Sequence, residues 1–177
     1  MKKYKHHIQV IRGDITTAKV DCIVNAANKW LIPGGGVDHA IHQAAGPELA
    51  KAVKKFHHCE PGNAVITPGF QLKATSVIHA VGPIWNESEN KKELQRVISK
   101  TYQSIYELAT KHAIQSIAIP NISTGVYAFP KEIAAEIAME TTFAFLKSSR
   151  SKMKIFFYCF EEDNYDLYTA LLQKLDS

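Results

Sequence analysis

The residues between positions 25 and 38 have side chains and a bare backbone that could bind an anionic, hydroxyl-rich ligand. The segment "NAANKWLIPGGGVD" has an amide at Asn28, three consecutive glycines at 34–36 and a carboxylate at Asp38. Glycine loses more backbone freedom on folding than any other residue, so three in a row need a reason. A glycine loop that leads into a helix offers free N–H groups and the positive end of the helix dipole to an anion. The alternative is a tight turn with close packing of helix on sheet.

This loop departs from two common nucleotide-binding patterns. After Gly34 and Gly36, the third position of the dinucleotide fingerprint is His39 instead of glycine. No Gly-Lys-Ser/Thr follows, as a P-loop would require. The glycines therefore predict an anion site without assigning it to either class.

A second segment, "NISTGVYAFP" at 121–130, is also rich in donors. Ser123, Thr124 and Gly125 can offer backbone and hydroxyl donors to a phosphate. The central serine resembles half of a nucleophile elbow, but Asn121 stands two positions before it and no histidine follows His112. The order Ser, acid, His of an α/β-hydrolase cannot be built, so this class is excluded.

The histidines and cysteines do not have the spacing of metal ligands. His6–His7 and His57–His58 are adjacent pairs, whose side chains point apart on a strand or a helix. No His-Glu-x-x-His or Cys-x-x-Cys occurs, and the three cysteines are far apart, at Cys22, Cys59 and Cys159. The sequence predicts no metal, no cofactor and no disulfide framework.

Size and charge narrow the class of protein. The chain has 177 residues and a mass of 19.7 kDa, which predicts a single domain over 1–177. Its net charge of +4 favours anionic partners, but the lysines are scattered and lack the dense stripe of a nucleic-acid binder. We find neither a membrane-spanning run nor a secretory signal, so we expect a cytoplasmic protein that does not enter a membrane.

Short apolar runs alternate with longer amphipathic patterns. We expect strands at 7–13, 21–27, 63–69, 75–83, 115–121 and 154–160, and helices at 37–45, 46–56, 90–113, 130–148 and 164–175. This alternation predicts an α/β layered domain with both faces of its sheet covered. Ligands of open α/β sheets bind outside the carboxyl ends of the strands, so we expect the loops 13–17, 25–38 and 121–130 to share one edge.

Longer ordered stretches carry a resemblance to a known family. They are "GDIT", "VDCIVNAAN", "GGGVDHAIHQAAG", "VIHAVGP", "ISTGVYAFP" and "CFEEDNYDLY", and they extend from about Ile8 to about Leu175. Together they resemble the macrodomain family, and within it the subgroup that hydrolyses ADP-ribose attachments. The resemblance implies a three-layer α/β/α sandwich around a central mixed sheet.

The resemblance also implies a role for each loop. Asp14 accepts a hydrogen bond from the adenine amino group, with the Ile15 backbone beside it, and Phe160 stacks on the adenine. Asn28 bonds the distal ribose and Asp38 orients or activates the attacking water. The diphosphate and distal ribose are gripped from opposite sides by Gly34, Gly35, Gly36 and Val37 and by Ser123, Thr124, Gly125, Val126 and Tyr127. On residue type alone, Asp14, Asn28 and Asp38 could instead be turn or cap residues.

The implied activity is hydrolytic. The leading hypothesis is removal of ADP-ribose from mono-ADP-ribosylated acidic side chains, deacetylation of O-acetyl-ADP-ribose, or both, by a positioned water in a monomer. The zinc-containing variant of the family is excluded because "KWLIPGGGV" has no cysteine or histidine. Alternatives are a non-catalytic module that binds ADP-ribose, and a binder of poly-ADP-ribose or single strands, whose affinity would fall steeply with salt.

Three positions depart from the pattern of this subgroup. Pro33 and Ala128 stand where glycine is common, and His39 follows the aspartate where glycine is also common. Proline fixes one φ angle and removes a donor, so it stiffens the loop or loses a contact. We expect His39 to face outward.

Overall fold

The computed structural model describes residues 2–174; Met1 and residues 175–177, including the end of the predicted closing helix at Leu175, lie outside the described part. The strands are β1 (Ile8–Arg12), β2 (Cys22–Ala26), β3 (Ala64–Pro68), β4 (Ser76–Ala80), β5 (Ser116–Pro120) and β6 (Lys154–Cys159). The helices are α1 (Lys2–Lys5), η1 (Ile15–Thr17), α2 (Gly36–Ala45), α3 (Pro47–Lys54), α4 (Lys91–Lys111), α5 (Lys131–Ser149) and α6 (Glu162–Lys174). Every predicted element is present, and the two short helices α1 and η1 are additions to the prediction.

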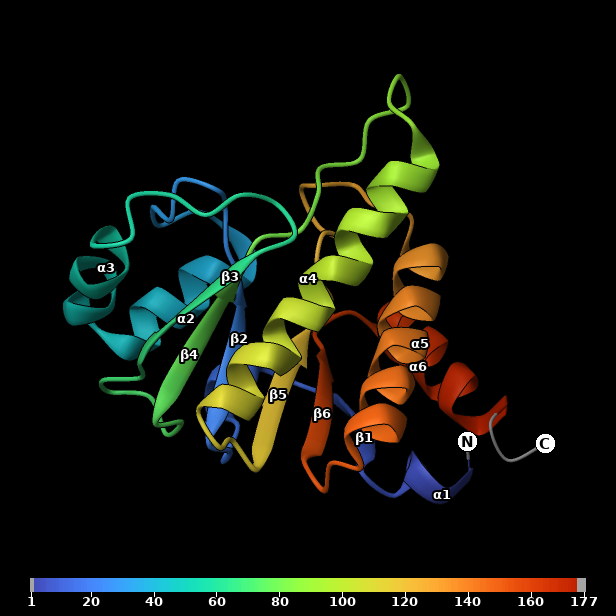
Figure 1. Cartoon of the computed structure of the whole chain (residues 1–177). Helices are drawn as coiled ribbons and strands as arrows, with labels where there is room; N and C mark the ends of the chain where they lie inside the picture. The colour runs from blue at the N-terminus through green and yellow to red at the C-terminus, as the bar shows by residue number, and fades with distance from the viewer. Residues whose placement is uncertain (1, 175–177) are drawn as a thin grey trace.

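The six strands form one mixed sheet in the order β1-β6-β5-β2-β4-β3 (Figure 1). All neighbouring pairs are parallel except β3 and β4, which are antiparallel. Parallel strands buried on both sides have continuous apolar sequences, and "CIVNA" in β2 follows this rule except at Asn25. The central mixed sheet that the family resemblance implies is confirmed.

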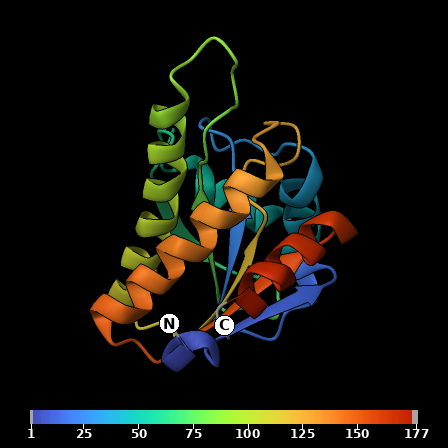
Figure 2. The same cartoon turned by 90° about the vertical axis from the view of Figure 1, so that its right-hand side faces the viewer.

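Helices cover both faces of the sheet. The side chains of α4, α5 and α6 pack on one face with one set of alternating strand residues, which includes Val24, Ile78 and Ile155. On the other face, η1, α2 and α3 pack with the alternate set, which includes Ile23 and Val77. Figure 2 shows α4, α5 and α6 side by side on their face. The arrangement is the predicted three-layer α/β/α sandwich.

The longest helix, α4, packs through the apolar stripe expected from its sequence. Leu94, Ile98, Tyr102 and Ile105 are buried, and Val97 and Leu108 are half-buried at its margin. Asn90 caps the helix by accepting from the backbone N–H groups of residues 92 and 93. Within residues 2–174, no helix has both the length and the apolar character that crossing a membrane requires.

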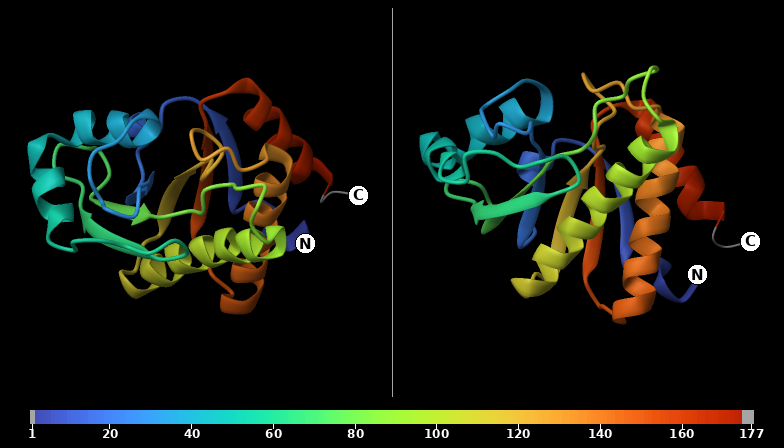
Figure 3. Two further views of the ribbon diagram at one scale, coloured as in Figure 1. Left: turned by 90° about the horizontal axis from the view of Figure 1, so that it is seen from above. Right: turned by 45° about the horizontal axis from the view of Figure 1, so that its top comes forward.

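The carboxyl ends of the five mutually parallel strands lie at one edge of the sheet, at the top of Figure 1 and facing the viewer in the left part of Figure 3. The chain leaves β2 for α2 on one face, whereas it leaves the adjacent β5 for α5 on the opposite face. Connections that diverge in this way open a crevice between two neighbouring strands, where α/β proteins bind ligands. The predicted loops 13–17, 25–38 and 121–130 all emerge at this edge.

Candidate active site

The glycine loop borders open space instead of packing against the protein. A Cβ added at Gly35 or Gly125 would meet no atom within 4 Å. Gly35 has φ −94° and ψ −172°, a conformation that any residue adopts. Neither backbone strain nor close packing explains a glycine there, so the tight-turn alternative fails at this position. A glycine there leaves the backbone open to the close approach of a ligand.

Helix α2 begins at this loop with unsatisfied donors. Its N-cap is Gly35, which has no side chain to accept from the first turn. Gly36, at φ +59°, turns the chain into the helix in a conformation that favours glycine. The backbone N–H groups of Gly36 and Val37 therefore point out of the helix end without a side-chain cap, an arrangement that favours an anion.

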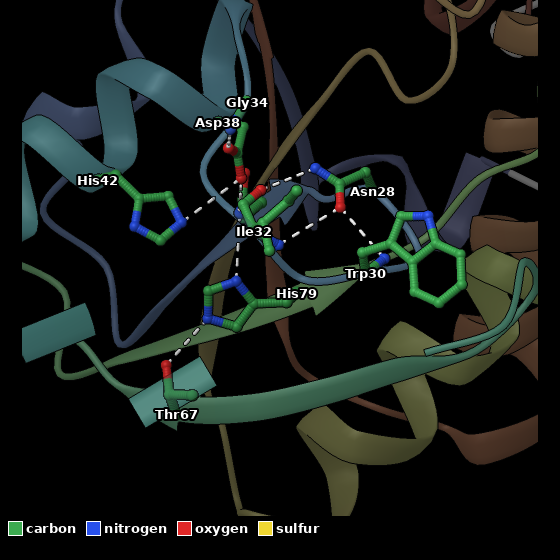
Figure 4. Close-up of polar contacts among 9 residues, drawn as sticks. Asn28, Trp30, Ile32, Gly34, Asp38, His42, Thr67 and His79 are labelled. Atoms are coloured by element: carbon green, nitrogen blue, oxygen red, sulfur yellow. Dashed lines mark hydrogen bonds and ion pairs between the residues drawn. The ribbon is translucent and has the colours of Figure 1, made fainter. Parts of the chain in front are cut away.

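Asp38, in the first turn of α2, is buried, and three groups hold its carboxylate (Figure 4). Its Oδ2 accepts from the Gly34 backbone N–H at 2.5 Å, and its Oδ1 accepts from Asn25 Nδ2 at 2.6 Å. His42, one turn along α2, places Nε2 3.6 Å from Oδ1. These contacts fix the direction of the carboxylate beside the glycine loop.

Behind Asp38, a polar chain crosses three strands on the α2 face of the sheet. Asn25 Nδ2 lies 3.1 Å from His79 Nδ1, and His79 Nε2 lies 3.0 Å from the Thr67 hydroxyl (Figure 4). All three side chains are buried. Burial, and to a smaller degree His42, lowers the pKa of His79 to about 3. The imidazole is therefore neutral at physiological pH.

The lowered pKa of His79 predicts a pH-dependent loss of stability. Between 6.5, the ordinary value, and about 3, the unfolded chain binds a proton at this residue and the folded chain does not. The contribution of neutral His79 to the free energy of unfolding is fully present above pH 6.5 and is lost as the pH falls toward 3. We expect the gap in free energy of unfolding between wild type and His79→Gln to narrow over this window in urea denaturation. Parallel pH dependences of the two proteins would contradict the assignment.

Asn28 holds its own loop together. Its Oδ1 accepts from the backbone N–H groups of Trp30 at 3.1 Å and Ile32 at 3.4 Å, and its Nδ2 donates to the Ile32 carbonyl at 2.7 Å. A Cβ on Gly34 would lie 3.5 Å from both Asn28 Nδ2 and Asp38 Oδ2. Asn28 and Asp38 thus flank the same glycine, and one hydrogen on Asn28 Nδ2 remains for another acceptor.

The loop after β5, residues 121–130, emerges at the same edge of the sheet, from the strand beside β2. Ser123 has φ +65° and a buried Oγ without a hydrogen-bond partner among the described residues. Strain and an unpaired buried hydroxyl are both costly and are found most often at functional sites. Ala128, where the related pattern has glycine, also has a positive φ of 54°. Val126, between them, is 95% exposed.

Tyr127 connects this loop to the rest of the site. Its carbonyl accepts from the Trp85 backbone N–H at 2.8 Å, which joins the loops after β4 and β5. Burial and the Asp38 charge both raise the pKa of the Tyr127 hydroxyl. The phenol is half-buried and stays protonated, so it can donate a hydrogen bond in the crevice.

The predicted adenine end lies at the carboxyl ends of β1 and β6. Asp14 caps η1: its Oδ1 accepts from the Thr16 N–H at 2.9 Å and the Thr16 hydroxyl at 2.8 Å, and Oδ2 stays available. Ile15 is buried. Phe160, directly after β6, is 81% exposed. An exposed aromatic ring beside an acceptor fits the face and edge of a base.

The segment after Phe160 is held by ion pairs that the sequence did not predict. Lys131 Nζ lies 2.5 Å from Glu161 Oε2 and 2.6 Å from Asp163 Oδ2, and Arg12 pairs with Glu162 at 3.3 Å. The two carboxylates raise the pKa of Lys131. These contacts tie the start of α6 to α5 and β1, and so limit where the ring of Phe160 can lie.

The structure brings the predicted residues to one edge and adds others. Asn28, Asp38 and Gly34 lie together, and the Ser123–Tyr127 loop emerges at the same edge from β5, the neighbour of β2. Sequence reasoning missed the residues that support them, which are Asn25, His42, Thr67, His79, Gly82 and Lys131. His39 is exposed, as predicted. Within residues 2–174, no three His, Cys, Asp or Glu side chains gather as a metal ion would need.

An α/β/α sandwich whose glycine-rich loops meet where the connections from neighbouring parallel strands diverge has the architecture of α/β proteins that bind ligands at this position. The family model described as the Macro domain matches residues 24–138. The chain is 47% identical to an O-acetyl-ADP-ribose deacetylase of Enterobacter sp. (strain 638) over 95% of this chain and 94% of that protein. The chain belongs to the macrodomain family.

Two solved structures show the same fold. The Oceanobacillus iheyensis macrodomain with ADP superposes with a TM-score of 0.89 and 39% identity, covering 96% of this chain and 91% of that one. A Trypanosoma brucei macrodomain in complex with ADP-ribose gives 0.87 and 39%, covering 94% and 69%.

Proposed function

We propose that this chain is a hydrolase that cleaves acyl esters of the distal ribose of ADP-ribose. Its substrates are O-acetyl-ADP-ribose, or proteins with ADP-ribose on an acidic side chain, or both. The observation that carries the proposal is the Asp38 carboxylate, buried and fixed by Gly34 and Asn25 beside a glycine loop that faces open space. A module that only bound ADP-ribose would not need a carboxylate held in this way.

The ligand would lie along the sheet edge. Asp14 and the backbone of Ile15 take the adenine edge, and Phe160 stacks on its face. The loop Gly34–Val37 binds the diphosphate from one side, through the N–H groups of Gly35, Gly36 and Val37, because the Gly34 N–H already donates to Asp38. The loop Ser123, Thr124, Gly125, Val126 and Tyr127 closes over it from the other side. The free hydrogen of Asn28 Nδ2 bonds a hydroxyl of the distal ribose.

The reaction needs a water and no external group. Asp38 orients a water and accepts its proton as the oxygen adds to the acyl carbon. The tetrahedral intermediate then expels the ribose oxygen, which takes the proton back from Asp38 and so restores the carboxylate. The products are ADP-ribose and the free acid, acetate or a protein carboxylate. Backbone N–H groups of the glycine loop and the Tyr127 hydroxyl would stabilise the developing negative charge.

The related deacetylase of Enterobacter and the ligand-bound relatives support this proposal. We further propose that residues 1–177 act as one macrodomain. Cytoplasmic location, a monomeric state and independence from metals stay predictions of the sequence.

To test the proposal, wild-type protein is incubated with O-acetyl-ADP-ribose and, separately, with a protein that carries ADP-ribose on a glutamate side chain. Release of acetate or of ADP-ribose in many turnovers supports the hydrolase. Binding of ADP-ribose in calorimetry without release from either substrate would overturn the proposal and leave a non-catalytic binding module. Affinity for a single strand that exceeds the affinity for ADP-ribose would favour the nucleic-acid alternative.

The adenine end makes a separate prediction. Phe160→Ala should weaken ADP-ribose binding about tenfold, because stacking of a base on an aromatic ring contributes about 1–3 kcal/mol. The matched control is Phe70→Ala, since Phe70 is also an exposed phenylalanine but follows β3 at the opposite edge. Titration calorimetry measures both. Equal affinities of the two variants would remove Phe160 from the site.

A further inference from the structure

We propose that His79 is a positioning residue that, as the neutral tautomer with its proton on Nε2, orients Asp38 through Asn25. The kinetic consequence rests on the proposed function. The tautomer does not, because it follows from the hydrogen-bond chain alone.

The hydrogen-bond chain that links Thr67, His79, Asn25 and Asp38 runs through the interior of the fold. Asn25 on β2 lies beside His79 on β4 in the parallel register, and Thr67 on the neighbouring β3 points to the same face. Asn25 is 0% exposed, His79 1% and Thr67 4%. Burying polar groups costs free energy unless hydrogen bonds compensate, whereas apolar side chains would fill the same space without that cost. A chain of hydrogen bonds across three strands therefore needs a reason beyond packing.

The carboxylate of Asp38 determines which groups donate and which accept in the hydrogen-bond chain. Asn25 Nδ2 lies 2.6 Å from the carboxylate Oδ1 and 3.1 Å from His79 Nδ1. A carbonyl oxygen in its place would be repelled by the carboxylate at that distance, so the amide nitrogen faces both groups. Its two hydrogens serve one acceptor each. His79 Nδ1 therefore accepts and has no proton.

The contacts at Thr67, the other end of the hydrogen-bond chain, indicate the same tautomer of His79. His79 Nε2 lies 3.0 Å from Thr67 Oγ1, and the Thr67 hydroxyl donates its single hydrogen to the Pro68 carbonyl at 3.1 Å. The Thr67 oxygen can then only accept, and it accepts the Nε2–H of His79. Each donor hydrogen from Thr67 to Asn25 therefore has one acceptor, and no two donors face each other between Thr67 and Asp38.

A proton on Nδ1 would break this order. The N–H of His79 would then face the N–H of Asn25, and the amide could relieve the conflict only by turning its oxygen toward Asp38. The titratable groups that face His79 are His42, with ring centroids 6.4 Å apart, and Asp38 beyond Asn25. Burial keeps the ring neutral, so Asp38 keeps its orientation over the pH range in which the protein is folded.

The kinetic test uses Thr67→Val, which removes the acceptor of Nε2–H with little change of shape. We expect kcat for O-acetyl-ADP-ribose to fall about tenfold, with KM and the Kd for ADP-ribose within about twofold of wild type, because orientation is lost and binding is not. Thr67→Ser keeps the hydroxyl and should restore kcat. The matched control is Thr142→Val, since Thr142 is also a buried threonine, and its hydroxyl bonds Tyr106 on the opposite face. An unchanged kcat in Thr67→Val, or an equal loss in Thr142→Val, would overturn the proposal.

A spectroscopic test needs no turnover and remains informative if Thr67→Val does not fold. Long-range ¹H–¹⁵N NMR correlations of the wild-type imidazoles, with His79 assigned by its loss in His79→Gln, distinguish the two neutral tautomers from imidazolium. We expect the Nε2–H form at every pH at which the protein is folded. The Nδ1–H form, or a ring that titrates near its ordinary value, would overturn the proposal. A wild type that shows the Nε2–H form but no hydrolysis would refute the proposed function and leave the tautomer in place.

Discussion

Asp38→Ala is expected to lower kcat by about 10²-fold or more, the usual contribution of a positioned general base, while ADP-ribose binding stays within about threefold. The carboxylate is buried, and its contacts are to the protein itself, namely Gly34, Asn25 and His42. The groups proposed to hold the ligand are backbone N–H groups and other side chains, so they survive the change. Steady-state kinetics and titration calorimetry on the same preparation measure both quantities.

The control is Asp21→Ala, because Asp21 at the opposite edge of the sheet also accepts from backbone N–H groups, those of Gln115 at 2.8 Å and Ser116 at 3.1 Å. The control should lose stability and keep kcat. Full activity in Asp38→Ala would remove the carboxylate from the mechanism. Loss of binding along with activity would make it a ligand contact or a structural anchor.

Gly82→Ala is expected to weaken ADP-ribose binding about tenfold or more, because a displaced loop loses hydrogen bonds to a charged ligand, each of which contributes about 1.5–3 kcal/mol. A Cβ at Gly82 would lie 2.1 Å from Ser123 Oγ and 2.7 Å from Ile122 Cγ2. The loop after β5 must therefore move away from Gly82. Overpacking of this kind also lowers the free energy of unfolding by about 1–3 kcal/mol.

A second substitution separates displacement of the loop from general damage. Ser123→Ala removes the atom in closest conflict, and its Cβ stays 3.4 Å from the added methyl group. The double variant Gly82→Ala/Ser123→Ala should bind ADP-ribose more tightly than Gly82→Ala alone, a non-additivity that a double-mutant cycle measures. Wild-type affinity in Gly82→Ala would show that the loop position does not matter for the ligand.

The order and type of the main elements could be predicted because their patterns are local. The Ile- and Val-rich runs that became β2 and β5, and the apolar stripe of α4, are visible in windows of a few residues. The strand order could not be predicted in this way, because it depends on which buried faces pair across the chain. The one-turn helix at Lys2–Lys5 has no apolar period to reveal it.

The residues of the candidate site likewise divide into those that local sequence reveals and those that only the fold brings together. Residues in loops with unusual composition, such as Gly34–Gly36 and Ser123–Gly125, stand out in the sequence. Thr67 and His79 are separated in the sequence from Asp38, and only the register of β2, β3 and β4 brings them together. A polar residue interrupts the apolar runs of both β2 and β4, at Asn25 and His79, and that shared interruption was the available indication.

The central claim is that this crevice hydrolyses an acyl ester with a water held by Asp38. The most direct measurement is a single turnover of O-acetyl-ADP-ribose in ¹⁸O-labelled water, with the acetate analysed by mass spectrometry, for wild type and Asp38→Ala. The account predicts one ¹⁸O in the acetate released by wild type and little release by the variant, although both bind ADP-ribose. Unlabelled acetate, or equal release by the two proteins, would contradict it.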